Sequence, residues 1–227
     1  MVESRMADRL FMEAMRLARA GENMRAFDMF GRILSLDPSH NMAAYNRGVI
    51  LLRMGRLKES AEVFLNLFSR IPDDPDIFIN LGKIMDMSGK PDQAMDFFRK
   101  ALEHDPGNPE ANCMVGVLLG RSHGKYEEAV EYFDKALKTA ADMPEARQGL
   151  AICYHHLGDT DKAMINIRAA IRMDPENGVL HNHLGIMYMK MGEEERADKH
   201  FRRALELNPG LKLRHQNLWD MKSSLHG

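Results

Sequence analysis

Apolar side chains in residues 75–108 recur at the spacing of helical turns, which predicts two amphipathic helices separated by a short break. The apolar residues of the first predicted helix are Ile77, Ile79, Leu81, Ile84 and Met85. Those of the second predicted helix are Ala94, Phe98, Ala101 and Leu102. The break is Ser88-Gly89-Lys90-Pro91, where glycine can take a positive φ and proline suits a first helical turn. The stretch is therefore predicted to fold as a helical hairpin.

Small residues on these helices indicate where neighbouring helices approach. Gly82 has no side chain to hold an antiparallel helix away, so we expect a close helix contact there. Ala94 and Ala101 would admit a neighbouring helix, and Phe98 would fill the gap between hairpins. The dipeptide 105–106 should end the second helix, because the residue before a proline disfavours the helical conformation.

The same pattern recurs on both sides of this stretch. Six copies are predicted, at residues 7–40, 41–74, 75–108, 109–143, 144–177 and 178–211. Pro38, Pro72 and Pro106 follow one another at intervals of 34 residues. The fourth copy is irregular, because it has one additional residue in the stretch 118–125 and Ala141 in the place of the proline. We therefore expect a loosened contact between the fourth and fifth copies.

A period of 34 residues with these small, aromatic and proline positions resembles the tetratricopeptide repeat (TPR) family. The resemblance implies an all-α fold, a right-handed α-solenoid of TPR helical hairpins that forms a single superhelix over residues 1–227. The first helix of each hairpin would line the concave side. Residues 212–225 would form a capping helix, with Trp219 buried against the sixth copy.

Members of this family that bind peptides contact them mainly through positions two, five, nine, twelve and thirteen of the first helix. The resemblance therefore implies candidate groove residues at Phe11, Met15, Tyr45, Val49, Arg53, Ile79, Lys83, Cys113, Val117, Gln148, Ile152 and Asn182. Those at positions five and nine of the first four copies form a mainly apolar stripe, which suits an amphipathic helix or a hydrophobic peptide. The alternative is that the stripe packs between successive first helices.

The two edges of this expected groove carry opposite charges. Position two is mainly acidic, as at Asp76 and Glu110, and position thirteen is mainly basic, as at Arg19 and Arg53. The helix dipole alone would favour the same arrangement, so the charges do not by themselves indicate a ligand. The family's clamp for the tails of heat-shock chaperones is not expected, because only asparagine agrees at the matching positions.

Composition and charge argue against several functional classes. The chain has 227 residues, 44% of them hydrophobic and 28% charged, with a formal net charge of −2, which argues against general binding to nucleic acids or anionic membranes. It contains no apolar run of about 18 residues, and charges interrupt Met1–Leu10, so we expect a cytoplasmic protein without direct membrane insertion.

We find no pattern of residues that indicates catalysis. Nucleophile motifs and glycine-rich phosphate loops are missing from the sequence. The histidine pairs 155–156 and 181/183 lack the spacing that places two ligands on one helix face. Cys113 and Cys153 have neither metal nor redox spacing. We therefore expect no enzyme activity, cofactor or metal.

The sequence favours a non-enzymatic scaffold or adaptor that binds a peptide or helix of a partner protein in the concave groove. A bacterial assembly such as a pilus, secretion or organelle-coat system is one setting for such an adaptor, and the sequence does not choose among these. A self-assembling structural scaffold, and hence a homo-oligomer, is the alternative. A third hypothesis makes the chain the repeat region of a larger enzyme.

Overall fold

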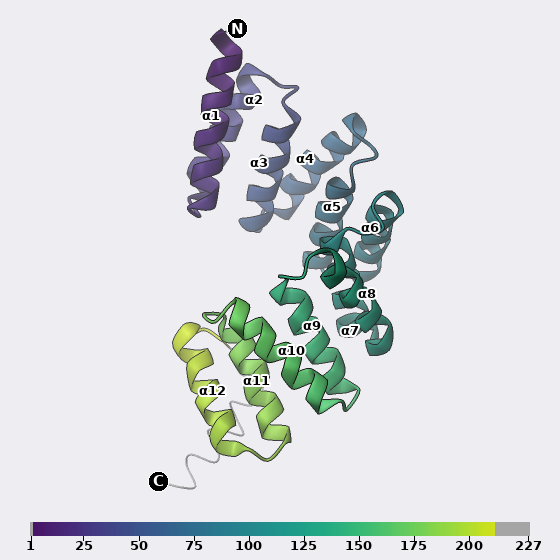
Figure 1. Cartoon of the computed structure of the whole chain (residues 1–227). Helices are drawn as coiled ribbons and strands as arrows, with labels where there is room; N and C mark the ends of the chain where they lie inside the picture. The colour runs from purple at the N-terminus through teal and green to yellow at the C-terminus, as the bar shows by residue number, and fades with distance from the viewer. Residues whose placement is uncertain (1, 212–227) are drawn as a thin grey trace. The chain divides into compact units, whose positions relative to one another are not determined.

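The computed structural model describes the backbone of residues 2–211 and, apart from residues 2–6 and 8, their side chains. This part of the chain is all-α, with twelve helices and no strand (Figure 1). The helices are α1 (Val2–Arg19), α2 (Asn23–Leu36), α3 (Asn41–Arg53), α4 (Leu57–Arg70), α5 (Pro75–Met87), α6 (Pro91–His104), α7 (Pro109–His123), α8 (Tyr126–Thr139), α9 (Pro144–His156), α10 (Thr160–Met173), α11 (Gly178–Lys190) and α12 (Glu194–Leu207). The expected capping helix and Trp219 lie outside the described residues.

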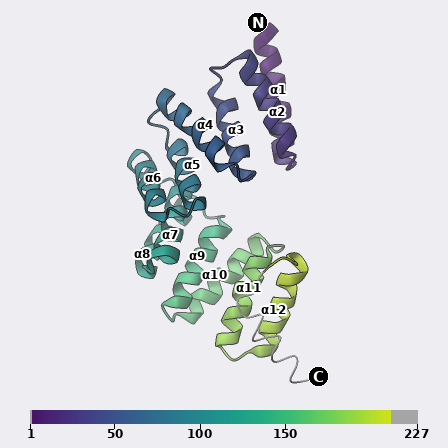
Figure 2. The ribbon, with the colours of Figure 1, turned by 180° about the vertical axis from the view of Figure 1, so that it is seen from behind.

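The helices follow one another as six hairpins, and each hairpin falls on one of the predicted repeats (Figures 1 and 2). The first hairpin starts earlier than predicted, because α1 begins at Val2. Each hairpin turn contains one glycine with φ between 65° and 82°. These glycines are Gly21, Gly55, Gly89, Gly124, Gly158 and Gly192. A left-handed backbone is strained for residues that have a Cβ atom, so glycine at this place allows the chain to reverse its direction.

Several helices begin with a side-chain cap. Asp74 accepts a hydrogen bond from the backbone N–H of Asp76 at 2.9 Å, and Pro75 occupies the first turn of α5. Asp159 caps α10 in a similar way through the N–H of Lys162 at 3.0 Å. Such caps satisfy donors that have no partner inside the helix.

The predicted close contact at Gly82 is confirmed. A Cβ atom added to Gly82 would lie 2.5 Å from the ring of Phe98, so the aromatic ring rests directly on the backbone of α5. The same arrangement recurs between Gly48 and Phe64 and between Gly185 and Phe201. Glycine on the first helix and phenylalanine on the second thus fix the distance between the two helices of a hairpin.

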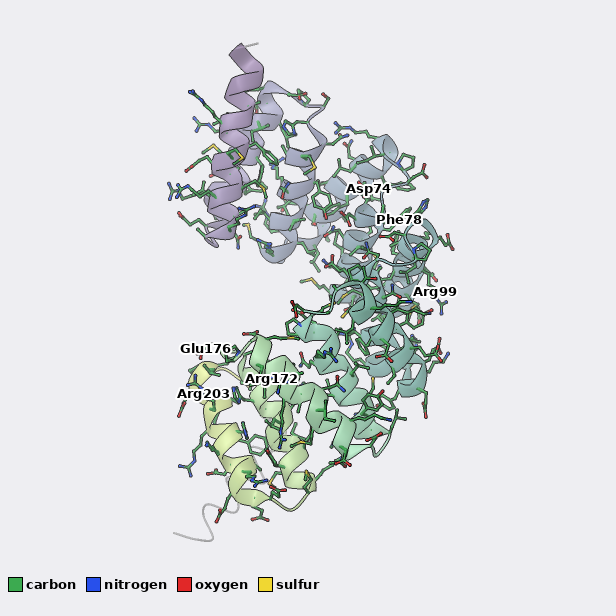
Figure 3. The ribbon with its side chains drawn as sticks, in the orientation of Figure 1. Asp74, Phe78, Arg99, Arg172, Glu176 and Arg203 are labelled. Carbon is green, nitrogen blue, oxygen red and sulfur yellow. The ribbon has the colours of Figure 1, made fainter. Side chains whose placement is uncertain are left out.

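The chain divides into two compact units, Met1–Ala111 and Asn112–Gly227, with the boundary inside α7. In unit 1 the buried core includes Phe30, Phe64 and Phe98. In unit 2 it includes Ile167, Leu184 and Phe201, and Arg203 of α12 reaches Glu176 with an Nη2–Oε1 distance of 3.0 Å (Figure 3).

The loosened contact expected between the fourth and fifth repeats is not present. The helices α8 and α9 pack against each other inside unit 2. A Cβ atom added to Gly149 would lie 2.2 Å from the ring of Phe133, so this contact is as close as those within hairpins. Gly149, which was not among the predicted contact positions, admits the Phe133 ring of the preceding repeat despite the missing proline.

Candidate partner-binding surface

The side of the first helices that carries repeat positions five and nine is called the first-helix face here. In unit 1 it is hollowed along α1, where a depression of about 630 Å³ is lined by Arg9, Phe11, Met12, Glu13, Met15, Arg16 and Arg19. Its apolar part consists of Phe11 and Met15, which are half-buried, and of Met12, which is 70% exposed. The sequence analysis selected Phe11 and Met15 and missed Met12, because Met12 stands at position six.

Packing underneath holds these apolar side chains in place. The ring of Phe11 meets the edge of Phe30 at 5.9 Å between centroids and stacks on His40 at 5.5 Å. Met15 packs against the buried cluster that includes Ala14 and Leu17. The floor of the α1 hollow is therefore a supported surface that still exposes apolar atoms.

Charged groups surround the α1 hollow. Arg16 donates two hydrogen bonds to Glu13, at 2.6 and 3.0 Å, and these bonds lower the pKa of the Glu13 carboxyl group. Arg9 and Arg19 have no ion-pair partner among the side chains that the structure describes. A ligand in this place would meet apolar atoms beside two uncompensated guanidinium groups.

On α3 and α5 the predicted groove residues are partly used to join repeats. The amide of Asn80 donates to the Tyr45 hydroxyl oxygen at 2.9 Å, and the Tyr45 ring meets the edge of Phe64 at 5.6 Å. Burial, together with the nearby charge of Asp76, raises the pKa of Tyr45 to about 12. Val49 is half-buried in the same cluster. Tyr45 is thus a link between the second and third repeats.

Other predicted residues of unit 1 differ in accessibility. Ile79 is only 1% exposed and belongs to the core. Lys83 forms an ion pair with Glu110. Arg53 is exposed, and its guanidinium lies 3.4 Å from the carbonyl oxygen of Ala18. Ile79 is therefore covered in this structure, whereas Lys83 and Arg53 keep accessible charges.

The predicted acidic edge is present near the start of α5. Burial raises the pKa of Asp76, and the negative charges of Asp74 and Glu110 raise it further. Lys83 offsets part of this effect through its own charge. The carboxylates at position two of the third and fourth repeats thus influence each other electrostatically, as their common position in the repeat predicts.

In unit 2 the corresponding face is more polar and more enclosed. Cys113 is fully buried, and Asn182 is buried with its Oδ1 atom unpaired among the described groups. Val117 and Ile152 are half-buried. Gln148 contacts His183, with 3.0 Å between Nε2 and Nδ1. This contact joins position five of one repeat to position six of the next, as Tyr45 and Asn80 do in unit 1.

Neither a metal site nor a membrane-spanning segment is found in the described part of the chain. Over residues 2–211 no three His, Cys, Asp or Glu side chains come together in a group that could hold a metal ion. Within the same range no helix is both long and apolar enough to cross a membrane. Burial raises the pKa of the Cys153 thiol to about 11, so this cysteine is not a reactive thiolate at neutral pH.

Five sequence profiles described as tetratricopeptide repeat match the chain, at residues 11–75, 75–108, 97–131, 121–165 and 179–211. The chain belongs to the tetratricopeptide repeat family. Repeat proteins of this family are generally scaffolds for interactions between proteins, and the helical hairpins described above are its repeating unit.

Solved TPR structures have the same fold. PilW, a type IV pilus biogenesis factor, matches with a TM-score of 0.76 and 20% identity over 94% of this chain and 98% of its own. PilF of Pseudomonas aeruginosa matches with a TM-score of 0.77 and 15% identity over 97% of this chain and 100% of its own. A chain of the APC/C hetero-tetramer Cut9–Hcn1 matches with a TM-score of 0.85 and 14% identity over 90% of this chain, which spans only 41% of that chain.

Proposed function

We propose that this TPR protein is a non-enzymatic adaptor that binds an apolar segment of a partner protein, an amphipathic helix or a peptide, on its first-helix face. The observation that carries the proposal is the α1 hollow of about 630 Å³, in which Phe11, Met12 and Met15 form an apolar floor. Methionine side chains are flexible and polarisable, so such a floor can adapt to the shape of the segment it binds.

The charges around the hollow indicate the chemistry of the partner segment that would bind there. Arg9 and Arg19 stand beside the apolar floor without ion-pair partners in the described structure. A partner segment with apolar side chains on one side and acidic ones next to them would satisfy both features. With a formal net charge of −2, the whole protein has no general attraction for nucleic acids or anionic membranes, and a cytoplasmic location is part of the proposal.

The test compares Met12→Glu with Met24→Glu. Met24 is 56% exposed on α2 and lies outside the hollow, so it is a matched control. Each replacement should change the free energy of unfolding by less than about 0.5 kcal/mol, because both side chains are exposed. A photo-crosslinking amino acid at position 12 would capture the partner for identification by mass spectrometry, and the purified partner would then be titrated against both variants.

We expect Met12→Glu to weaken binding at least tenfold and Met24→Glu to leave it unchanged. Equal affinities for the two variants would remove the α1 hollow from the proposal. Light scattering of the unaltered protein, which measures its mass at several concentrations, tests whether the partner is a second copy of the chain. In that case the mass would rise with concentration, and Met12→Glu would reverse the rise.

A further inference from the structure

A second cleft of unit 1 lies between α2 and α4, over α3, and none of the predicted groove residues lines it. It consists of two adjoining hollows, of about 370 and 530 Å³, that share Phe27, Leu34 and Arg47. Further apolar lining comes from Ala44, Leu51 and Val63. The combined cleft is called the Arg47 cleft here.

Arg47 interrupts the internal pattern of the repeats. It stands at position seven of the second repeat, where the later repeats carry a buried apolar side chain. These side chains are Leu81, Val115, Leu150 and Leu184, and each is at most 3% exposed. An apolar residue at this position packs the hairpin, so the arginine brings a charge to a place that the fold itself fills with leucine or valine.

Arg47 forms no ion pair among the described side chains. Its charge nevertheless acts on Glu59: after the hydrogen bonds from Arg56, the charge of Arg47 also helps to lower the pKa of the Glu59 carboxyl group. The Arg47 guanidinium lies over the ring of Phe27, with 4.3 Å from Cζ to the ring centroid, and its Nε atom is buried without a hydrogen-bond acceptor in the described structure. Glu59 is the nearby acid, but it accepts two hydrogen bonds from Arg56, at 2.7 and 2.5 Å. Stacking on Phe27 offsets part of the cost of this position. The Nε donor is covered, so the two terminal nitrogens, which form no hydrogen bond in the described structure, are the donors that stay available to a ligand.

Gly31 is a second unusual feature of the same cleft. It lies in the interior of α2, where glycine is less favourable than alanine. Packing does not require it, because an added Cβ atom would meet only the Nε atom of Arg47, at 4.0 Å. The glycine leaves the backbone of α2 uncovered beside Arg47, which allows another chain to approach closely.

We infer that the Arg47 cleft is a docking surface for a partner segment in which one acidic side chain is flanked by apolar ones. The apolar lining would accept the flanking side chains. A carboxylate can take two parallel hydrogen bonds from a guanidinium in a partly desolvated place, where such pairs are strongest. Asp28, Glu59 and Glu62 line the cleft together with Arg32, Arg47 and Arg70, so the acids and the arginines are equal in number. A single carboxylate fits this balance better than a more highly charged anion such as phosphate. The surface is separate from the α1 hollow, so the inference does not depend on the function proposed above.

The test uses the full chain labelled with ¹⁵N and two small probes. One probe is the peptide acetyl-Leu-Glu-Leu-amide, and the other is acetyl-Leu-Gln-Leu-amide, which lacks the carboxylate. We expect the glutamate peptide to shift the NMR signals of Arg47, Gly31 and Val63, and to bind about tenfold more tightly than the glutamine peptide. Inorganic phosphate should produce no comparable shifts.

Arg47→Leu supplies the decisive variant, because leucine occupies the same position in other repeats. This variant should melt at the same or a higher temperature and should lose the preference for the glutamate peptide. Lys58→Leu, an exposed change on α4 outside the cleft, should keep it. If Arg47→Leu lowers the melting temperature by several degrees, Gly31→Leu is measured in its place. The leucine side chain would fill the cleft, and leucine is a better helix former than glycine, so this variant should fold and lose the preference for the glutamate peptide.

Three results would overturn the inference. The first is equal binding of the two peptides to the unaltered protein. The second is an unchanged preference in Arg47→Leu or, where that variant melts early, in Gly31→Leu. The third is a set of shifts confined to Phe11, Met12 and Met15, which would assign the peptide to the α1 hollow instead.

Discussion

The link between Tyr45 and Asn80 gives a prediction that can be worked out from the structure. The Asn80 amide donates to the Tyr45 hydroxyl oxygen at 2.9 Å and also to the carbonyl oxygen of Asp76 at 2.8 Å. In Tyr45→Phe the amide keeps its second acceptor, so the loss should be that of one hydrogen bond, about 0.5–1.5 kcal/mol. Asn80→Ala should cost more, about 1–3 kcal/mol, because Asn80 is 97% covered and its removal leaves a gap.

A double-mutant cycle isolates the link itself. Tyr45→Phe, Asn80→Ala and the double variant would be unfolded in urea and followed by circular dichroism, with hydrogen exchange in α3 and α5 as a local measure. We expect a coupling free energy of about 0.5–1 kcal/mol between the two sites. A coupling of zero within error would refute the reasoning and would leave the Tyr45 hydroxyl available to a ligand.

The same link predicts a response to alkaline pH. The folded-state pKa of Tyr45 is raised from 10.0 to about 12, mainly by burial, so the folded protein favours the neutral phenol. The contribution of the buried phenol to the free energy of unfolding is fully present below pH 10.0. It is lost as pH rises from there toward 12, because the phenol ionises first in the unfolded state. Tyr45→Phe should lose less stability over this interval than the unaltered protein. Identical pH profiles would contradict the burial of the hydroxyl.

Three further predictions concern packing and acid. Gly82→Ala should lower the free energy of unfolding by about 1–3 kcal/mol in urea denaturation, because its Cβ atom would lie 2.5 Å from Phe98, whereas Gly31→Ala should be neutral or stabilising. Ile79→Glu should cost several kcal/mol in thermal melting, because a charge would enter the core; a normal melting temperature would show that this part of the stripe is open. Burial, together with the charge of His181, lowers the pKa of His200 below 6.5. The free energy of unfolding should therefore fall as pH drops below about 6.5, and His200→Gln should make the fall between pH 7.5 and 5.5 smaller.

The sequence by itself determined the hairpins and their places along the chain. Helix periodicity, a glycine in each turn and a capping residue or proline at several helix starts are local signals, and each acts within a few residues of chain. For this reason the positive φ at Gly89 and the close helix contact at Gly82 could be foreseen from one repeat and transferred to the others. The ring that makes this contact, Phe98, was expected between hairpins and lies within its own.

Tertiary packing decided which side chains of the first helices stay accessible. Phe11 and Ile79 share position five of their repeats, yet Phe11 borders a hollow and Ile79 is buried, because each meets different neighbours from adjacent repeats. Position in the repeat gives the direction of a side chain, while its exposure depends on the volumes packed around it. Arg47 shows the same division. Its departure from leucine can be seen in the sequence, but only the structure places its guanidinium over Phe27 in a cleft, where it forms no ion pair among the described side chains.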